Sequence, residues 1–264
     1  MSTVDKALSV LDLFSESRPS IGLSEASRLL QRDKATVQRY LAVLNERGFL
    51  EQDPLTRAYH LGPAVTRLAL VRDRTYPVEV SVRKRLRKLV VDTGETAHVS
   101  HFQKGGLSEV LIEETTFNGT RVYIDPAELL PLHASASGIA FLSAKPVDEA
   151  AQLLNSLLNR YTHATPTDVD EVLDHVRLAK ERRYALMAGT FEIDVVGMAA
   201  PIFDFGNHVC GAVAVAMPVS RFNKDVERRN HSHVIDTAED ISRLYGANLS
   251  RDETPAKREA CLGA

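Results

Sequence analysis

Five neighbouring residues near the N-terminus have side chains suited to contact DNA. Lys and Arg neutralise phosphates or bind guanine, Gln pairs with adenine, and Thr contacts phosphate or the methyl group of thymine. Apolar residues recur at helical spacing through the same segment and must face a core, so the five share the exposed side of one helix. They occupy its first turns, the end that usually reaches base edges. The five residues are Lys34, Ala35, Thr36, Gln38 and Arg39.

The surrounding segment predicts the elements that position this helix. Ser24 is expected to cap a short helix, and Asp33 is expected to cap the longer helix that carries the five residues. Gly48 is expected to end the longer helix, and a turn at Asp53-Pro54 joins two short strand-like runs. The apolar positions of the longer helix are Val37, Tyr40, Leu41 and Leu44.

Two further residues, Arg57 and Tyr59, are expected near the tip of the hairpin and complete the predicted DNA contacts. A short helix, a turn, a longer helix and a hairpin are the outline of a winged helix-turn-helix. The alternative is a helical hairpin with ordinary solvated charges. The hairpin, the turn and the placement of the charges all favour the winged domain.

The composition is that of a globular protein with two domains. The chain has 264 residues, of which 44% are hydrophobic and 25% are charged. Its two cysteines, Cys210 and Cys261, provide neither a disulfide framework nor metal-ligand spacing, which suits a reducing cytoplasm. No apolar run is long enough to cross a bilayer. The sequence therefore predicts a soluble cytoplasmic protein with no membrane partner.

The formal net charge of −3 is unevenly distributed along the chain. Basic residues exceed acidic ones in residues 61–93, whereas acidic residues predominate in residues 94–264. The acidic part is therefore the part least suited to contact nucleic acid. Since residues 1–60 are neutral as a group, tight binding to DNA is expected only from a dimer or a higher oligomer.

The chain is expected to fold in four parts, in the α+β class. A first helix is expected over residues 5–15, with Val4, Leu8, Leu11 and Leu13-Phe14 facing inward. The helix expected at residues 64–73 is a linker that also packs against a partner subunit, or a plain linker. The expected parts are a winged helix-turn-helix at 1–61, a linker helix at 62–77, an effector-binding domain at 78–250 and a disordered tail at 251–264.

The third part alternates strand-like and helical patterns. It begins with a strongly basic helix at residues 78–93, whose charges are expected to form a solvated face. The pattern that follows is typical of an α+β sensor domain. Strands are expected at Ala97–Phe102, Ser108–Glu114, Arg121–Ile124, Gly197–Phe203 and Val209–Met217, with a turn at Gly206-Asn207. Helices are expected at 136–145, 147–160, 168–183 and 223–247.

Three separated motifs resemble the isocitrate lyase regulator (IclR) family of bacterial transcriptional regulators. The segment DKATVQRYLAVLNERGFL is similar to the recognition helix of the family, and VDKALSVLDLF is similar to its opening helix. LPLHASASGIAFL, from Leu130, and MAAPIFDFGNHVCGAVAVAMP, from Met198, are similar to two segments of its effector domain. The resemblance covers nearly the whole chain, in the right order.

The resemblance implies a winged helix-turn-helix, a helical linker and a GAF-like α/β effector domain that binds a small organic acid. It also implies a homodimer, often paired into a tetramer, on a pseudopalindromic double-stranded DNA operator. Family members repress or activate catabolic operons, so the direction of control stays open. Neither the motifs nor the resemblance implies a cofactor, a metal or a catalytic residue.

Four residues depart from the pattern of family members that bind very small acids. In those members an Asp, a Cys and two strand serines make the pocket polar. The matching residues here are Met187, Gly197, Ala214 and Ala216, none of which offers a side-chain hydrogen bond. Unpaired ligand oxygens would cost about 1–3 kcal/mol each. We therefore expect a larger and more apolar ligand, aromatic or longer-chain, rather than a glyoxylate- or pyruvate-sized acid.

The run from Ser135 to Gly138 begins a helix, and a helix N-terminus favours an anion. With the family match, a ligand carboxylate is expected on the backbone N–H groups of Ala136 and Ser137. The alternative is that Ser135 and Ser137 merely cap the helix. His133 is expected to orient the loop, to touch the ligand or to be purely structural. The expected walls are Val122, Leu130, Met187, Val195, Gly197, Ala214 and Ala216.

The sequence leaves two other classes of function as alternatives to a regulator. An enzyme with an appended DNA-binding module would use Cys210 as a nucleophile, yet no His or acid is placed in the sequence to activate this thiol. His98 and His101 are expected on opposite faces of a strand, which does not suit a shared metal. The other alternative is an assembly protein with a vestigial pocket.

Overall fold

The computed structural model describes residues 3–15, 18–75, 77–103, 105–125, 127–154 and 158–249. The chain forms two compact units, and the division between them falls between Pro77 and Val78. The expected tail at 251–264 and Cys261 lie outside the described residues. Within the described part of the chain, no helix has the length and apolar character needed to cross a bilayer.

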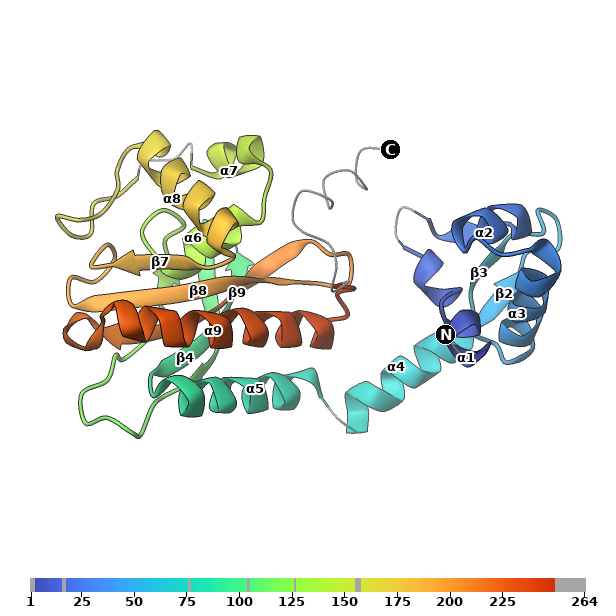
Figure 1. Ribbon diagram of the computed structural model, residues 1–264, viewed down its shortest axis with the longest axis horizontal. Coiled ribbons are helices and arrows are strands. Elements are labelled where there is room, and N and C mark those ends of the chain that lie inside the picture. The colour runs from blue at the N-terminus through green and yellow to red at the C-terminus, as the bar shows by residue number, and fades with distance from the viewer. Residues whose placement is uncertain are drawn as a thin grey trace. The chain divides into compact units, whose positions relative to one another are not determined.

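The N-terminal unit is a small helical domain with a three-stranded antiparallel sheet (Figure 1). Its strand order is β1-β3-β2, so β3 is central. Helices α2 and α3, followed by the β2–β3 hairpin, give the winged helix-turn-helix arrangement that the sequence predicts. The elements are α1 (Thr3–Leu8), a 3₁₀ turn (Leu11–Leu13), β1 (Ser20–Ile21), α2 (Leu23–Leu29), α3 (Lys34–Glu46), β2 (Leu50–Gln52), β3 (Tyr59–Leu61) and α4 (Pro63–Thr75).

Local signals fix both ends of α3. The side chain of Asp33 accepts a hydrogen bond from the backbone N–H of Thr36 at 2.8 Å, as expected of an N-cap residue. Gly48, with φ of 73°, follows the end of the helix in a conformation that favours glycine. The face between these ends is buried at Val37, Leu41 and Leu44.

Two details of this unit differ from the predictions. The N-cap of α2 is Gly22, which has no side chain that could cap the helix. The prediction that Ser24 caps this helix is therefore wrong. The first helix is shorter than residues 5–15, and Val4 and Leu8 are exposed. Val10, beyond the end of α1, is fully buried instead. The irregular backbone after Leu8 turns Val10 into the core, which a continuous helix would not do.

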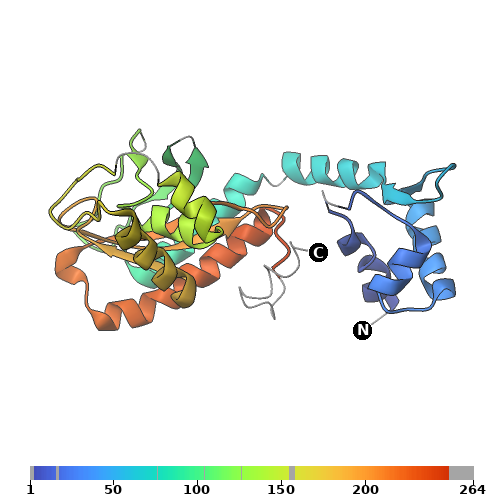
Figure 2. The same cartoon turned by 90° about the horizontal axis from the view of Figure 1, so that it is seen from above.

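The C-terminal unit contains a six-stranded antiparallel sheet with strand order β6-β5-β4-β9-β8-β7. Helices α5 and α9 lie side by side on one face of the sheet, and α6 and α8 lie on the other (Figures 1 and 2). The elements are α5 (Val78–Thr93), β4 (Thr96–Gln103), β5 (Gly106–Glu113), β6 (Leu129–Leu130), α6 (Ala136–Ser143), α7 (Val147–Leu153), α8 (Val169–Arg182), β7 (Ala185–Ala188), β8 (Val195–Phe203), β9 (Val209–Pro218), a 3₁₀ turn (Val219–Arg221) and α9 (Lys224–Leu244).

The two faces of the central strands differ in side-chain size. Along β9, Val213, Val215 and Met217 pack against α5 and α9, whereas Ala212 and Ala214 face α6. The same alternation occurs in β8, where larger side chains face α9. Small residues on one face let α6 approach the sheet closely. They also leave room for a cavity beside the start of that helix.

Several expected elements are shorter or absent. Residues 121–124 form no strand, so that prediction is wrong, although these residues lie beside the sheet. The helix expected at 147–160 ends at Leu153, and residues 155–157 lie outside the described part of the chain. The short strands β6 and β7 were not predicted, because their two and four residues are too few for a clear alternation.

The basic helix α5 is ion-paired rather than simply solvated. Arg83 and Arg87 both contact Glu113 on β5, and Arg85 contacts Asp240 on α9. Surface pairs of this kind are worth about 0–1 kcal/mol each. Through these ion pairs, the basic residues of α5 contact acidic residues of the C-terminal unit itself. The charge pattern of the sequence alone does not reveal this.

Candidate functional site

The first turns of α3 present a polar and basic surface. Lys34, Ala35, Gln38 and Arg39 are exposed, and Thr36 is half-buried. The guanidinium of Arg39 lies 3.5 Å from the hydroxyl of Thr36. The predicted contact residues therefore share one accessible face, as the helical spacing requires.

The hairpin places Arg57 at an exposed and ordered turn. The carboxylate of Asp53 accepts hydrogen bonds from the backbone N–H groups of Leu55 at 2.8 Å and Thr56 at 2.7 Å. These bonds, that of Thr56 first, lower the pKa of Asp53. Arg57 has a φ of 62°, and its carbonyl accepts a hydrogen bond from the side chain of Gln52. The turn is thus fixed by its own side chains, with the side chain of Arg57 in solvent.

The structure places Tyr59 in the core rather than near the tip of the hairpin. Only 3% of Tyr59 is exposed, and the residue pairs with Ile21 on β1 and Gln52 on β2. Its hydroxyl lies 3.5 Å from the side-chain nitrogen of Gln38. The expectation of an exposed Tyr59 is therefore wrong, because β3 is the central strand and turns this side chain toward α3.

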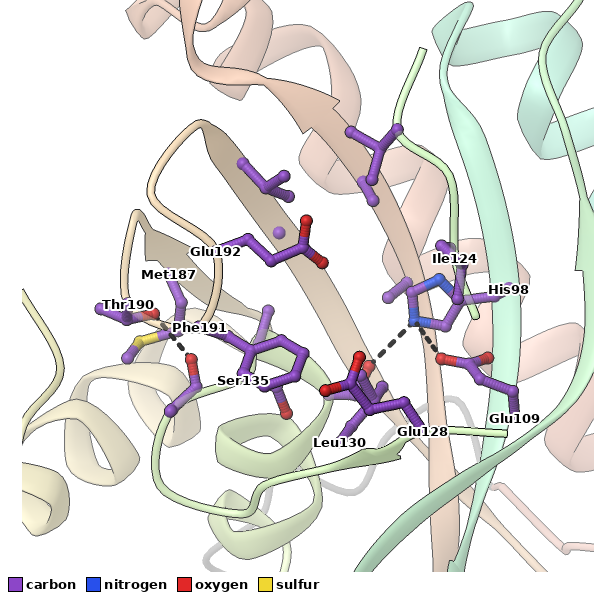
Figure 3. Close-up of a pocket in the computed structure, with 18 of the residues that line it drawn as sticks. His98, Glu109, Ile124, Glu128, Leu130, Ser135, Met187, Thr190, Phe191 and Glu192 are labelled. Carbon is purple, nitrogen blue, oxygen red and sulfur yellow. Dashed lines mark hydrogen bonds and ion pairs between the residues drawn. The ribbon is translucent and has the colours of Figure 1, made fainter. Parts of the chain in front are cut away.

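The C-terminal unit has a cavity of about 70 Å³ between the sheet and the start of α6 (Figure 3). Most of the predicted effector residues line it. They come from β6, β7, β8 and β9, from the N-cap and first turn of α6, and from the segment between β5 and β6. The predicted residues that line the cavity are Val122, Leu130, Ser135, Ala136, Ser137, Met187, Val195, Gly197, Ala214 and Ala216.

Strand register explains why these residues meet. Met187 on β7 is opposite Gly197 on β8, which is opposite Ala216 on β9. Ala214 on β9 is opposite His98 on β4. Residues opposite one another in adjacent strands point to the same face, so these side chains form one continuous floor.

The start of α6 faces this floor with unused backbone donors. Ser135 caps the helix, and its hydroxyl accepts a hydrogen bond from the N–H of Gly138 at 3.0 Å. The N–H groups of Ala136 and Ser137 lie in the first turn, where no intrahelical acceptor is available. A side chain at Gly197 would begin 2.9 Å from the Cβ of Ala136 and 3.9 Å from its nitrogen. Glycine at this position therefore keeps the helix start accessible.

Two predicted residues, His133 and Gly138, do not line the cavity. The ring nitrogen Nε2 of His133 contacts the carbonyl of Asn159 at 2.9 Å, so this side chain ties down a loop. Gly138 packs against the preceding turn, where a Cβ would lie 2.4 Å from the carbonyl oxygen of Leu132. Of the three roles expected for His133, its contact fits the orientation of a loop, and neither residue lies in the lining of the cavity.

The deepest polar groups of the cavity, His98 and Glu109, were not predicted. The ring nitrogen Nε2 of His98 lies 3.2 Å from the hydroxyl of Ser137 and 3.5 Å from a carboxyl oxygen of Glu109 (Figure 3). Burial lowers the pKa of His98 to about 4 and raises the pKa of Glu109 to about 8. At neutral pH both side chains are therefore uncharged.

A β-bulge explains the orientation of Glu109. The register of β4 and β5 shifts between Val99 and Ser100, so that Val99 is opposite Leu111 and Ser100 is opposite Glu109. Leu111 packs in the core beneath α5 and α9, whereas Glu109 faces the cavity. Regular alternation would place residues 109 and 111 on the same face, and the extra residue separates them.

Three more carboxyl groups lie at the mouth of the cavity. Asp125, Glu128 and Glu192 line it and are exposed. Burial raises the pKa of Glu192, and the nearby charge of Glu128 raises it further. No Lys or Arg is found among the described residues of the lining. The sequence gives no periodic signal for these loop positions.

Comparison with known proteins identifies the family. The profile described as "Bacterial transcriptional regulator IclR C-terminal" matches residues 74–243, and that described as "IclR helix-turn-helix domain" matches residues 3–54. The chain belongs to the IclR family.

Proteins related to this IclR member include the transcriptional regulator BhcR of Paracoccus denitrificans. The two are 31% identical over 240 residues, which cover 90% of this chain and 85% of BhcR. A solved IclR-type regulator from Silicibacter sp. TM1040 has a TM-score of 0.78 and 35% identity, over 95% of this chain and 98% of the other. An IclR homologue from Microbacterium hydrocarbonoxydans, complexed with 4-hydroxybenzoate, has a TM-score of 0.55 and 20% identity, over 92% and 99% of the chains, and so shares the fold.

The IclR relatives are transcriptional regulators rather than enzymes, and IclR regulators bind DNA and small-molecule effectors. Two features of this chain agree with a non-catalytic role. Burial, and then the charge of Asp204, raise the pKa of Cys210 to about 11, which disfavours the nucleophilic thiolate. Ser137 and Glu109 both approach the same nitrogen of His98, whereas a catalytic triad uses the two ring nitrogens separately.

A second and larger cavity, of about 220 Å³, lies between the ends of α6 and α8 and the helix α9. Its polar groups already have partners within this IclR chain. Arg183 pairs with Glu239 at 2.6 Å, Lys145 pairs with Glu149 at 3.3 Å, and the hydroxyl of Ser242 donates to the carbonyl of Ala238. The smaller cavity at α6 is therefore the better candidate for an effector site.

Proposed function

We propose that this IclR regulator binds a pseudopalindromic operator of a catabolic operon as a homodimer, through α3 and the hairpin. The accessible face formed by Lys34, Thr36, Gln38 and Arg39 carries this proposal, because it combines donors for base edges with charges for phosphates. Exposed Arg57 adds a contact from the hairpin. Related regulators are named as repressors, which supports repression as the mode of control.

Helix α4 supports the dimer in this proposal. Leu68 and Val71, three residues apart on α4, are 44% and 51% exposed. Neighbouring apolar side chains on one helix face are typical of a surface that packs against another subunit. Analytical ultracentrifugation of Leu68→Glu would test it: a shift toward monomer is expected, and an unchanged sedimentation coefficient would contradict it. Pairing of dimers into a tetramer would appear in the same measurement.

The effector in this proposal is a compact organic acid with an apolar body, aromatic or branched aliphatic. Its carboxylate lies on the N–H groups of Ala136 and Ser137, and its body lies against Met187, Val195 and Val122. The apolar walls of the cavity support the expected preference of the site for an apolar acid over small keto acids. The polar side chains of His98 and Glu109 weaken it, because they offer hydrogen bonds that the sequence did not reveal. The cavity of about 70 Å³ favours a compact body.

In this proposal the acid regulates the operon because it binds the DNA-free and the DNA-bound protein with different affinities. By linkage, the effector changes DNA affinity by the same factor by which DNA changes effector affinity. Titration of the acid into a preformed complex with labelled operator would measure this factor. A thermal-shift panel that includes 4-hydroxybenzoate, branched acids and pyruvate would identify the class. Stabilisation by pyruvate-sized acids alone would contradict the apolar body.

Arg39→Ala tests the DNA-binding face. An operator is first selected by the protein from a pool of random duplexes, and affinity is then measured by fluorescence anisotropy. Loss of a base contact should weaken binding by about 1–3 kcal/mol. Arg47→Ala is the matched control, because it removes the same charge at the opposite end of α3, where Arg47 is exposed. Equal affinity of the two folded variants would refute the assignment of Arg39.

A further inference from the structure

The effector cavity contains buried polar atoms that have no hydrogen-bond partner. Both carboxyl oxygens of Glu109 and the ring nitrogen Nδ1 of His98 are buried without a hydrogen-bond partner. The side chain of Glu109 is fully buried, and that of His98 is 7% exposed. The distance of 3.5 Å between Glu109 and Nε2 of His98 does not provide the missing bond. Buried polar groups of this kind normally have partners, so these atoms indicate a missing donor.

The unpartnered atoms of His98 and Glu109 lie next to the proposed carboxylate seat. Ser137 provides one N–H group of that seat, and its hydroxyl is 3.2 Å from Nε2 of His98. Figure 3 shows His98 in contact with Glu109 beside the first turn of α6. A ligand whose carboxylate occupies the helix start therefore has its neighbouring atoms close to the unpartnered acceptors. A donor on the carbon that bears the carboxylate is in reach of them.

The charges around the cavity favour a ligand with no net negative charge. Glu128 and Glu192 lie at its mouth, and no Lys or Arg is found among its described lining residues. A simple carboxylate would be attracted by the helix start and repelled by these two side chains. Within the described residues, no group of three or more His, Cys, Asp or Glu side chains is arranged to hold a metal ion. An organic cation therefore fits these acceptors better than a metal does.

We propose that the effector is an α-amino acid with an apolar side chain, whose ammonium group donates to Glu109 and His98. Its carboxylate occupies the N–H groups of Ala136 and Ser137, and its side chain lies against Met187 and Val195. This inference rests on the proposed effector site. An ammonium has three N–H donors, two of which serve the unpartnered oxygens of Glu109 once that carboxyl is ionised, and the third serves Nδ1 of His98 in the tautomer that carries its proton on Nε2.

Matched sets of ligands test the proposal on the full-length protein. One set is phenylalanine, 3-phenylpropanoate and 2-phenylethylamine, and the other is valine, 3-methylbutanoate and isobutylamine. Each set compares an amino acid with the same molecule lacking its amine or its carboxylate. Binding is measured by thermal shift and by calorimetry. At least one amino acid should bind about tenfold or more tighter than either of its partners.

Variants then assign the preference to the proposed acceptors. Glu109→Gln keeps the size of the side chain and replaces one acceptor with a donor, so the preference for the amino acid over its deaminated acid should fall by about tenfold. Glu181→Gln is the control, because Glu181 is exposed on α8 and lies outside the lining of the cavity. Equal preference in the two variants would overturn the role of Glu109.

The outcomes separate this inference from the proposed effector site. If a deaminated acid binds as tightly as its amino acid, the inference is overturned while the acid-binding site stands. If an amine alone binds as tightly as the amino acid, the cation is supported and the carboxylate seat at α6 is refuted. If no member of either set binds, both proposals are overturned.

Discussion

The buried carboxyl of Glu109 should make the stability of the protein depend on pH in a defined window. Burial raises the pKa of Glu109 from 4.5 to about 8 in the folded chain. Between these values the folded state retains a proton that the unfolded state has lost. The contribution of Glu109 to stability is therefore largest below pH 4.5 and is lost as pH rises through about 8.

His98 has the opposite effect over a lower range. Burial lowers the pKa of His98 from 6.5 to about 4, so its contribution increases stability as pH rises from 4 to 6.5. The two slopes nearly cancel between pH 4.5 and 6.5, and only that of Glu109 remains above pH 6.5. At about 1.4 kcal/mol per pH unit, reduced near the pKa itself, the wild type should lose about 1–2 kcal/mol between pH 6.5 and 8.

Glu109→Gln isolates this effect because an amide does not ionise in that range. The free energy of unfolding is measured by urea denaturation at several values from pH 6.5 to 8. Far-UV circular dichroism is the suitable signal, since the chain has no tryptophan. The difference in unfolding free energy between wild type and variant should change by about 1–2 kcal/mol across the window, with the variant favoured at pH 8. Glu181→Gln should follow the wild type, and parallel curves for wild type and Glu109→Gln would refute a buried neutral carboxyl.

Three other substitutions have clear expected outcomes. Asp33→Ala removes the N-cap of α3 and should lower the thermal stability of the winged unit by about 1 kcal/mol, against no change for exposed Arg47→Ala. Tyr59→Phe keeps the buried ring and should leave operator affinity within about twofold. A large loss of operator affinity in anisotropy titrations would show instead that the hydroxyl of Tyr59 contacts DNA. Gly197→Ala places a Cβ 2.9 Å from Ala136 and should abolish effector-induced thermal shifts while the protein remains folded, and retained shifts would contradict access through Gly197.

The sequence predicted the winged unit well where the signals are local. The cap at Asp33, the apolar spacing of α3 and the turn at Gly48 are each set by a few neighbouring residues. Tyr59 was misplaced because β3 has only three residues, and its facing depends on pairing with both β1 and β2. Strand facing in so short a run is set by distant partners, which periodicity does not report.

The cavity was predicted on one side only, for a related reason. Ala214 and Ala216 lie in the motif that begins at Met198, and Met187 and Gly197 were matched to pocket positions of the family; all four line one side of the cavity. His98 and Glu109 lie on β4 and β5, where a bulge sets which side chains face the cavity. A glutamate within an apolar strand was the available signal, because such a residue is rarely buried without a partner or a role.

Burial gives the carboxyl groups of this cavity different chemistry, and this difference sets the expected sign of proton linkage. Glu109 is uncharged at neutral pH because it is fully buried, whereas exposed Glu128 and Glu192 lie at the mouth. On β4 the groups beside Glu109 are His98 and, opposite it in register, Ser100, and neither is charged at pH 7. An ammonium placed beside Glu109 favours its ionised form, so binding releases a proton and affinity rises with pH toward about 8. A deaminated acid at the same seat meets a carboxyl that becomes negative, so its affinity falls over the same range. The slope of affinity against pH therefore distinguishes the two ligand classes.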